Sequence, residues 1–201
     1  MKILVSTPAY SRSVDIEYAK MMLNLERNTK HDYDYLFPVS SHISRNRNMC
    51  VLQALKDGHD AVLFVDSDIG IQDFTFVDKL IETGYKLNAR IIGGCYLMKK
   101  SDETVYVAVE KLPNGKIDNL RTKPDKPRLV EGCGTGCMLV FMDVFRKLSD
   151  PYFSIIDKAN LEVDPEDFWM CFNAIKAGFN IAIDPRFSTN HFGLKAWTHQ
   201  P

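Results

Sequence analysis

Short strands alternate with helical segments through the first hundred residues, and this alternation constrains the fold more than any other feature of the sequence. Runs with strand character cover residues 2–6, 33–38, 61–65 and 90–93. Apolar residues at helical spacing predict helices over about residues 13–28, 47–56 and 75–87. A strand followed by a helix and a second strand is the unit of a parallel sheet covered by helices, so we expect an α/β fold.

The second half of the chain changes character. Residues 105–109 and 116–120 have strand character and flank Pro113-Asn114-Gly115, in which the Asn-Gly step is a strong hairpin signal. The remaining predicted elements are strands over residues 129–133 and 138–142 and a helix that opens at Asp164-Pro165 and ends at Gly178. The sequence therefore predicts a mixed, mainly parallel sheet flanked by helices, with an antiparallel hairpin in the second half.

Length and composition limit the domain organisation and the class of protein. A chain of 201 residues with 45% hydrophobic residues can bury one core, and no linker or repeat divides it, so we expect a single domain over residues 1–201. A formal net charge of -1 excludes a global positive field for nonspecific binding of nucleic acid or membrane. No apolar run reaches the roughly 18 residues of a membrane span, and no signal peptide is recognisable. Because the 5 cysteines include no CxxC pair, we expect buried thiols in a cytoplasmic protein.

Asp66-Ser67-Asp68 follows the most apolar predicted strand, at the carboxyl end where open α/β sheets bind their ligands. Two carboxylates with one residue between them repel each other unless a cation or several hydrogen-bond donors compensate. A hard divalent ion, Mg²⁺ or Mn²⁺, supplies that compensation and also holds diphosphate oxygens. In the structural alternative, Asp66 caps a turn and Asp68 is solvated. The tripeptide is therefore a candidate metal site.

Two further positions carry groups that can do acid–base or ligand chemistry. Glu166-Asp167 lies in the first turn of a predicted helix, where the helix dipole favours ionised carboxylates, as expected of a general base. Acidic residues are also common there simply as partners of the dipole. His191 follows the last predicted strand and is a candidate metal ligand, although a lone histidine is more often structural.

Glycines and arginines mark two candidate contacts with a ligand. Gly132, Gly134 and Gly136 alternate in the sequence, which allows the backbone to approach a sugar or phosphate closely but also suits a tight turn into a strand. Arg45 and Arg47 lie at the start of a predicted helix, where free N–H groups already attract anions. The alternative for these two arginines is an ordinary solvated surface.

In their order and spacing, these motifs resemble those of the GT-A glycosyltransferases, particularly the family-2-like group and its small virus- or phage-type members. The resemblance spans nearly the whole chain and rests on Thr7-Pro8-Ala9-Tyr10, Arg47-Asn48, Val65-Asp66-Ser67-Asp68-Ile69-Gly70, Gly93-Gly94-Cys95-Tyr96, the segment 134–140, Glu166-Asp167 and His191-Phe192-Gly193. It implies a Rossmann-like GT-A fold, in which about residues 1–100 bind the nucleotide sugar and about residues 101–201 form the acceptor side. The chain departs from the family pattern in having no added acceptor domain.

The resemblance also implies roles for individual residues. Thr7, Pro8 and Tyr10 would line the pocket for the nucleotide base. Arg47 and Asn48 would also bind the nucleotide, because they match the family's Ala-Arg-Asn motif, although Asn46 replaces its alanine. Arg45 competes with Arg47 for this role. Asp66 would contact the ribose or the metal, and Asp68 and His191 would bind the metal. Gly134, Thr135 and Gly136 would shape the floor for sugar and acceptor, and Asp167, with Glu166 beside it, would be the general base.

The implied activity is transfer of a sugar from a nucleotide diphosphate sugar to an acceptor hydroxyl, with Mn²⁺ or Mg²⁺ as cofactor. The acceptor is left open among a glycan, a lipid-linked saccharide, a protein and a modified nucleobase. The basic segment 121–128, predicted to be an exposed loop, hints at an anionic acceptor.

Three other functions compete with this interpretation. A nucleotidyltransferase shares the layout and the metal-binding aspartates, but its Gly-rich, Arg-containing signature after the first strand is replaced here by Thr7-Pro8-Ala9-Tyr10. A haloacid-dehalogenase-type phosphatase expects threonine or valine where this chain has Gly70. A non-catalytic module that binds a sugar or nucleotide would retain the fold but would not need the full set of acidic residues and histidine.

Overall fold

The structure is a computed structural model in which residues 1–10, 12–28, 30–99, 104–157 and 163–192 are described. The helices are α1 (Ile16–Leu25), α2 (Ile43–Lys56), α3 (Phe76–Lys86), α4 (Met142–Lys147) and α5 (Glu166–Lys176). The strands are β1 (Lys2–Ser6), β2 (Asp32–Leu36), β3 (Ala61–Val65), β4 (Ile69–Ile71), β5 (Ala89–Gly94), β6 (Ala108–Lys111), β7 (Ile117–Asn119), β8 (Arg128–Val130), β9 (Gly132–Cys133), β10 (Cys137–Phe141), β11 (Ile156–Asp157), β12 (Val163–Asp164), β13 (Asn180–Asp184) and β14 (Thr189–His191).

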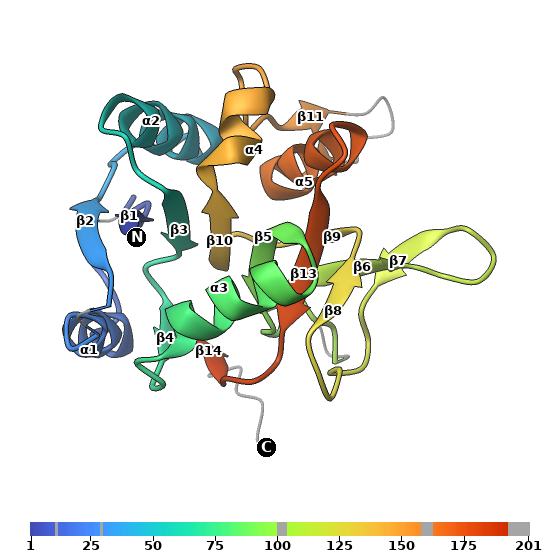
Figure 1. Cartoon of the computed structure of the whole chain (residues 1–201), viewed down its shortest axis with the longest axis horizontal. Coiled ribbons are helices and arrows are strands. Elements are labelled where there is room, and N and C mark those ends of the chain that lie inside the picture. Colours follow the sequence, from blue (N-terminus) through green and yellow to red (C-terminus); the bar gives the residue numbers. More distant parts are fainter. Residues whose placement is uncertain (11, 29, 100–103, 158–162, 193–201) are drawn as a thin grey trace.

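A 7-stranded sheet with the order β2-β1-β3-β10-β5-β13-β8 forms the centre of the molecule (Figure 1). β1 is parallel to both β2 and β3, and β5 is parallel to β13. β10 runs antiparallel between β3 and β5, and β8 is antiparallel to β13. The expectation of a mixed, mainly parallel sheet flanked by helices is confirmed.

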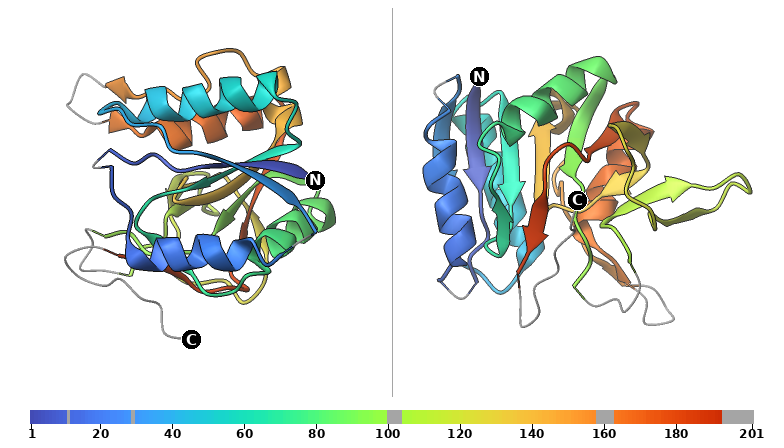
Figure 2. Two further views of the ribbon diagram at one scale, coloured as in Figure 1. Left: turned by 90° about the vertical axis from the view of Figure 1, so that its left-hand side faces the viewer. Right: turned by 90° about the horizontal axis from the view of Figure 1, so that it is seen from below.

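Helices cover both faces of this sheet because its central strands are apolar on both sides (Figure 2). Along β3, Val62 and Phe64 pack into one core cluster with residues of α2, α4 and α5. Ala61, Leu63 and Val65 alternate with them and pack into the other cluster with residues of α1 and α3. Since successive side chains of a strand point to opposite faces, a strand buried on both faces is a continuous apolar run. All 5 cysteines are buried free thiols, as expected.

The start of α2 differs from the prediction, and so does the end of the strand that precedes α4. α2 begins at Ile43 rather than near residue 47, so its first turn includes the polar residues Ser44, Arg45 and Asn46. Asn46 donates a hydrogen bond from Nδ2 to the Ser40 carbonyl oxygen, which apolar spacing cannot reveal. The predicted strand over residues 138–142 ends one residue earlier, and Met142 instead begins α4, which at 6 residues is too short to show helical periodicity.

The predicted hairpin is present and extends from the sheet. β6 and β7 pair antiparallel with Lys111 opposite Ile117, and Gly115 adopts a φ of 83°, which glycine tolerates without strain. The backbone N–H of Lys116 donates to Asn114 Oδ1, closing the turn. β6 also pairs with β9, so the hairpin is attached to the glycine-containing segment that precedes β10.

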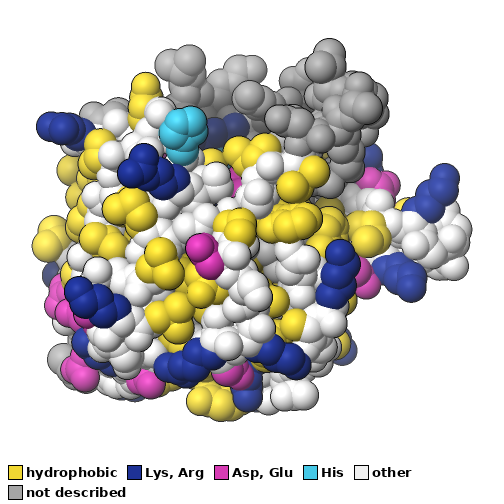
Figure 3. Space-filling model, turned by 90° about the horizontal axis from the view of Figure 1, so that it is seen from above, with side chains coloured by type: hydrophobic (Ala, Val, Ile, Leu, Met, Phe, Trp, Pro, Cys, Tyr) yellow, Lys and Arg dark blue, Asp and Glu magenta, His cyan; other side chains and the backbone are white. Residues whose placement is uncertain are grey.

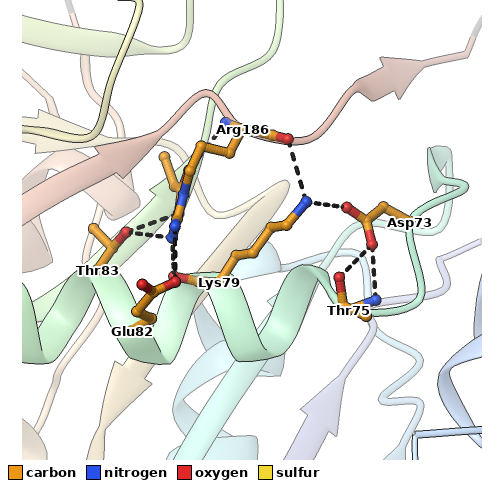
Figure 4. Close-up of polar contacts among 7 residues, drawn as sticks. Asp73, Thr75, Lys79, Glu82, Thr83 and Arg186 are labelled. Atoms are coloured by element: carbon orange, nitrogen blue, oxygen red, sulfur yellow. Dashed lines mark hydrogen bonds and ion pairs between the residues drawn. The ribbon is translucent and has the colours of Figure 1, made fainter.

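Arg186, which follows β13, fastens the end of that strand to α3 (Figure 4). Its guanidinium donates to both carboxylate oxygens of Asp184, to Glu82 at 2.7 Å, to the Lys79 carbonyl and to Thr83 Oγ1. Thr83 in turn donates its hydroxyl proton to Asp184 Oδ2 at 2.8 Å. The network satisfies Asp184, which is fully buried, and it positions the chain that leads to β14.

We expect Thr83→Val to lower the free energy of unfolding by about 2 kcal/mol, because the buried carboxylate of Asp184 loses a charge-assisted hydrogen bond. Thr83→Ser, which keeps the hydroxyl, should lose less than half as much. Urea denaturation of both variants measures the difference. Equal stability of Thr83→Val and wild type would show that the hydroxyl is not needed there.

One face of the molecule illustrates the near-neutral charge of the chain. On the face shown in Figure 3, lysine and arginine side chains are scattered among apolar ones rather than gathered into one patch. Within the described residues, none of the helices combines the length and the hydropathy that crossing a bilayer requires.

Candidate active site

The candidate site residues meet at one edge of the central sheet. β1 is parallel to β3, and β3 and β5 run in the same direction because β10 between them is antiparallel to both. The carboxyl ends of β1, β3 and β5 therefore lie at the same edge of the sheet. Cys137, the first residue of β10, pairs with Val65, the last residue of β3. This pairing puts the glycine-containing segment 134–136 next to Asp66, whose backbone N–H donates to the Gly136 carbonyl at 3.1 Å.

Arg47 holds two carboxylates that come from distant parts of the sequence. Its Nη2 donates to Asp66 Oδ1 at 3.3 Å, and its Nη1 donates to Glu166 Oε1. The Arg47 side chain is 5% exposed and that of Glu166 12% exposed, whereas the Asp66 side chain is 32% exposed. A buried ion pair of this kind orders the site, and it leaves Glu166 engaged rather than free to accept a proton. Arg45, by contrast, is exposed on the first turn of α2.

Asp167 lies against the segment that contains Gly134 and Thr135. A Cβ atom added to Gly134 would come within 3.3 Å of Asp167 Oδ2, so glycine allows this approach. Burial raises the pKa of Asp167, and the nearby Asp66 carboxylate raises it further. The positive charge of Arg47 and hydrogen bonds from the backbone N–H groups of Phe168 and Thr135 oppose this shift, but the pKa remains above its ordinary value. Asp167 is thus a carboxylate with increased basicity.

Tyr96 connects the parts of the site, although sequence reasoning identified it only as part of a glycine-containing motif. Its hydroxyl oxygen accepts a hydrogen bond from the Gly136 N–H at 2.8 Å. Its ring meets that of His191 edge to face, with centroids 5.5 Å apart. Burial raises the pKa of Tyr96 well above its usual range, and the charges of Asp66 and Asp167 raise it further. Tyr96 therefore stays a neutral phenol that packs among the charged groups.

Asp68 and His191 lie side by side, as the resemblance implied, because β14 pairs with β4 and places His191 opposite Ile69. The His191 Nε2 atom is 3.6 Å from Asp68 Oδ1. His191 Nδ1 is 3.1 Å from the Leu97 carbonyl oxygen, and a carbonyl can only accept, so the proton of the neutral ring is on Nδ1. The lone pair on Nε2 then faces a carboxylate oxygen.

Lys99 completes this second cluster. Its ammonium contacts Asp68 Oδ2, and sequence reasoning did not identify it. Burial raises the pKa of Asp68, but the contacts of its carboxylate with His191 and with the Lys99 ammonium outweigh burial and hold the pKa below its ordinary value. Asp68 Oδ1 is buried and has no hydrogen-bond partner, so one oxygen of this ionised carboxylate is uncompensated.

Comparison with solved structures identifies the fold. The viral protein A197 from STIV superposes with a TM-score of 0.70 at 17% identity, covering 100% of this chain and 95% of that chain. An apo UDP-glucose pyrophosphorylase superposes with a TM-score of 0.55 at 9% identity, covering 94% and 92%. A Bacillus anthracis chain assigned as a glucose-1-phosphate thymidylyltransferase and solved with sucrose gives 0.50 at 14% identity, covering 94% and 88%.

This is a nucleotidyltransferase/GT-A-like Rossmann fold. Two of the proteins that share this fold are named as a UDP-glucose pyrophosphorylase and as a glucose-1-phosphate thymidylyltransferase. No family model matches the sequence, and no curated protein matches it either.

Two of the residues predicted to contact the nucleotide, Thr7 and Asn48, have partners within the protein. Thr7 is fully buried, and its hydroxyl is 2.6 Å from the hydroxyl of Tyr18. Asn48 forms a pair of hydrogen bonds with the backbone of Phe153, donating from Nδ2 at 2.8 Å and accepting at Oδ1 at 3.0 Å. These contacts hold the first loop and α2 in place.

The other predicted residues on these loops differ in exposure. Pro8 is buried and Tyr10 is 73% exposed, so Tyr10 is the residue after β1 whose ring is free to meet a ligand. Thr135 is buried, and its hydroxyl oxygen has no hydrogen-bond partner. Gly193, the last residue of the predicted histidine motif, lies outside the described residues.

The predicted metal ligands form a pair rather than a closed set. Among the described residues, no group of 3 or more histidine, cysteine or acidic side chains is arranged to hold a metal ion. Asp68 and His191 are adjacent, whereas the Asp66 carboxylate is held by Arg47. Any metal here would therefore depend on ligands beyond these side chains, such as diphosphate oxygens or water.

Proposed function

We propose that this chain is a metal-dependent glycosyltransferase that transfers a sugar from a nucleoside diphosphate sugar to an acceptor hydroxyl. The observation that carries the proposal is the meeting of Asp66, Asp68, Asp167 and His191 with Arg47 at the carboxyl edge of the sheet. Ligands of open α/β folds bind at this edge. The carboxylates outnumber the cations that compensate them, which favours a bound metal ion over an anion alone.

The residues present fit a divalent cation, Mn²⁺ or Mg²⁺. Asp68 Oδ1 lacks a hydrogen-bond partner, and the lone pair of His191 Nε2 faces it from 3.6 Å. This separation is less than twice a metal–ligand distance of about 2.1 Å, so one ion can contact both atoms. The Leu97 carbonyl that accepts from Nδ1 is the kind of partner that fixes a metal-binding histidine in its tautomer. When bound, the ion would neutralise charge on the departing diphosphate.

Asp167 is the general base in this proposal. It would accept the proton of the acceptor hydroxyl while the acceptor oxygen bonds to the anomeric carbon and the bond from that carbon to the diphosphate oxygen breaks. Its raised pKa suits this role, since a more basic carboxylate accepts a proton more readily. Arg47 keeps Asp66 and Glu166 in place beside it, so Glu166 acts as a positioning residue.

A sugar nucleotidyltransferase is the second candidate, favoured by the fold shared with UDP-glucose pyrophosphorylase. In that reaction the nucleophile is a sugar phosphate, which is already anionic and needs no base to remove a proton. Asp167, with its raised pKa beside the glycine-containing segment, favours a hydroxyl nucleophile instead. The Thr7-Pro8-Ala9-Tyr10 loop, which lacks the Gly-rich signature, points the same way.

The products of the reaction decide between the candidates. With a panel of nucleotide sugars and Mn²⁺ or Mg²⁺, we expect slow release of nucleoside diphosphate even without acceptor, and the sugar that gives it identifies the donor. Pyrophosphate release from a nucleoside triphosphate and a sugar 1-phosphate would instead identify a nucleotidyltransferase. Binding without turnover under either metal would indicate a non-catalytic module.

We expect Asp68→Ala to weaken metal-dependent binding of the donor by at least roughly 100-fold, because a charged ligand to the metal is lost. Isothermal titration with donor, with and without Mn²⁺, measures this effect. Asp143→Ala is the matched control, since Asp143 pairs with Arg90 at the opposite edge of the sheet. Unchanged metal dependence in Asp68→Ala would remove Asp68 from the metal site.

A further inference from the structure

Lys99 occupies the side of Asp68 that His191 does not face. Its ammonium contacts Oδ2, whereas His191 Nε2 lies 3.6 Å from Oδ1. One oxygen of the Asp68 carboxylate thus contacts the positively charged ammonium of Lys99, and the other oxygen faces the Nε2 atom of His191. The Lys99 side chain is 29% exposed and that of Asp68 is 40% exposed, so solvent and ligands can reach both groups.

The position of Lys99 on the chain lets it move without disturbing the fold. It follows Leu97 and Met98, whose backbone is fixed by pairing with the segment that contains Tyr106. The lysine side chain has four rotatable carbon links beyond this anchored backbone, so its ammonium can exchange one anion for another nearby. Asp68 is on the neighbouring loop after β3 and is fixed by its carbonyl, which accepts from the Phe192 N–H at 2.8 Å.

A divalent ion that binds between Asp68 and His191 changes what is favourable for Lys99. The carboxylate is then shared with a doubly charged cation only a few ångströms from the ammonium, so its attraction for the ammonium falls and repulsion from the ion rises. A diphosphate held by that ion would then offer the ammonium another anion to contact. A lysine is well suited to that contact because its ammonium binds phosphate oxygens as a point charge.

We propose that Lys99 is an exchangeable counter-ion, which neutralises Asp68 in the free protein, gives way to the metal and then binds the diphosphate of the donor. This inference rests on the proposed function and adds a residue that binds the leaving group. It predicts opposite effects of removing one side chain: metal alone should bind more tightly, and diphosphate in the presence of metal should bind more weakly.

The test uses Lys99→Met with two probes, Mn²⁺ alone and inorganic pyrophosphate at saturating Mn²⁺, both by isothermal titration calorimetry. We expect Lys99→Met to bind Mn²⁺ roughly tenfold more tightly and pyrophosphate roughly tenfold more weakly than wild type. Lys86→Met is the matched control. Lys86 pairs with Glu82 on α3, so this substitution removes the same charge at a position away from the site. Lys99→Arg, which keeps the charge, should resemble wild type more than Lys99→Met does. Thermal unfolding establishes that each variant is folded.

The outcomes separate this inference from the function on which it rests. Mn²⁺ binding that is equal or weaker in Lys99→Met overturns the exchange, and so does unchanged pyrophosphate binding, while the glycosyltransferase proposal stands. Absence of Mn²⁺ binding in wild type and all Lys99 variants, both alone and with pyrophosphate present, overturns both the metal of the proposed function and this inference. A merely structural role of Lys99 predicts weaker binding of both probes.

Discussion

Asp167→Asn is expected to lower the turnover of sugar transfer by about a thousandfold while leaving donor binding close to that of wild type. The asparagine side chain has the same shape and retains an oxygen that can accept from the Phe168 N–H, but it cannot take a proton from the acceptor. Steady-state transfer rates and titration with donor measure the two quantities separately. Asp143→Asn, at the opposite edge of the sheet, should leave both unchanged.

The pH dependence of the same residue has a definite sign. Because burial raises the pKa of Asp167 in the folded protein, transfer should fall as the pH drops through that raised pKa, starting above the range of an ordinary aspartate. The ionised side chain is less favourable in the folded state than in the unfolded state, so at neutral pH it destabilises the fold. Asp167→Asn should therefore be at least as stable as wild type at pH 7, with the difference narrowing as the pH is lowered through the raised pKa.

If Asp167→Asn is inactive but no less stable than wild type, the role of Asp167 is catalytic rather than structural. If Asp167→Asn instead transfers sugar at the wild-type rate, Asp167 is not the base. If it loses activity and stability together, its loss of activity reflects disruption of the fold. Glu166→Gln provides a contrast within the same helical turn, since Glu166 is engaged by Arg47 and should affect turnover less than Asp167 does.

Arg47→Met is expected to lower the free energy of unfolding by about 3–5 kcal/mol, the cost of leaving one member of a buried ion pair without its partner. Methionine fills much of the space of the arginine stem, so the loss reflects charge rather than a cavity. Glu166 is the residue left uncompensated, because its side chain is 12% exposed, whereas the Asp66 side chain is 32% exposed and partly hydrated. This is a large part of the roughly 5–15 kcal/mol that stabilises a typical domain.

The double variant Arg47→Met/Glu166→Gln distinguishes the cause. Neutralising Glu166 removes the buried charge, so the double variant should recover at least about 2 kcal/mol relative to Arg47→Met. Urea denaturation of wild type, both single variants and the double variant gives the coupling between the two positions. A double variant no more stable than Arg47→Met would show that the ion pair is not the source of the loss.

The sequence predicted the layout of the sheet and the edge where the candidate site lies, for a simple reason. Strands buried on both faces are continuous apolar runs, and residues that follow parallel strands must meet at the same edge. Asp66 and Asp68 could therefore be expected at the carboxyl edge from their position after β3, whereas the insertion of β10 beside β3, which brings Gly134 to this edge, was not predicted. The adjacency of His191 and Asp68 required the resemblance to a known family, because β14 is too short to be recognised from its pattern.

The sequence could not predict which side chains pair. Arg47 and Glu166 are in different helices, and nothing in the local spacing of either indicates the other. Lys99 is one of many lysines in the sequence, and only its contact with Asp68 distinguishes it. For the same reason Asn48, predicted to bind the nucleotide, is found bonded to the Phe153 backbone. Such contacts depend on tertiary structure rather than on periodicity.

The antiparallel strand β10 has a consequence for the order in which the chain can fold. Its residues 137–141 fill the gap between β3 and β5, both of which are synthesised earlier. A nascent chain that has emerged only as far as β5 thus has two apolar strands with no neighbour between them, and pairing across long sequence separation is slow. The turn bearing Asp66 gains the Gly136 carbonyl as a partner only when β10 docks, so the candidate site is assembled late, after most of the polypeptide has left the ribosome.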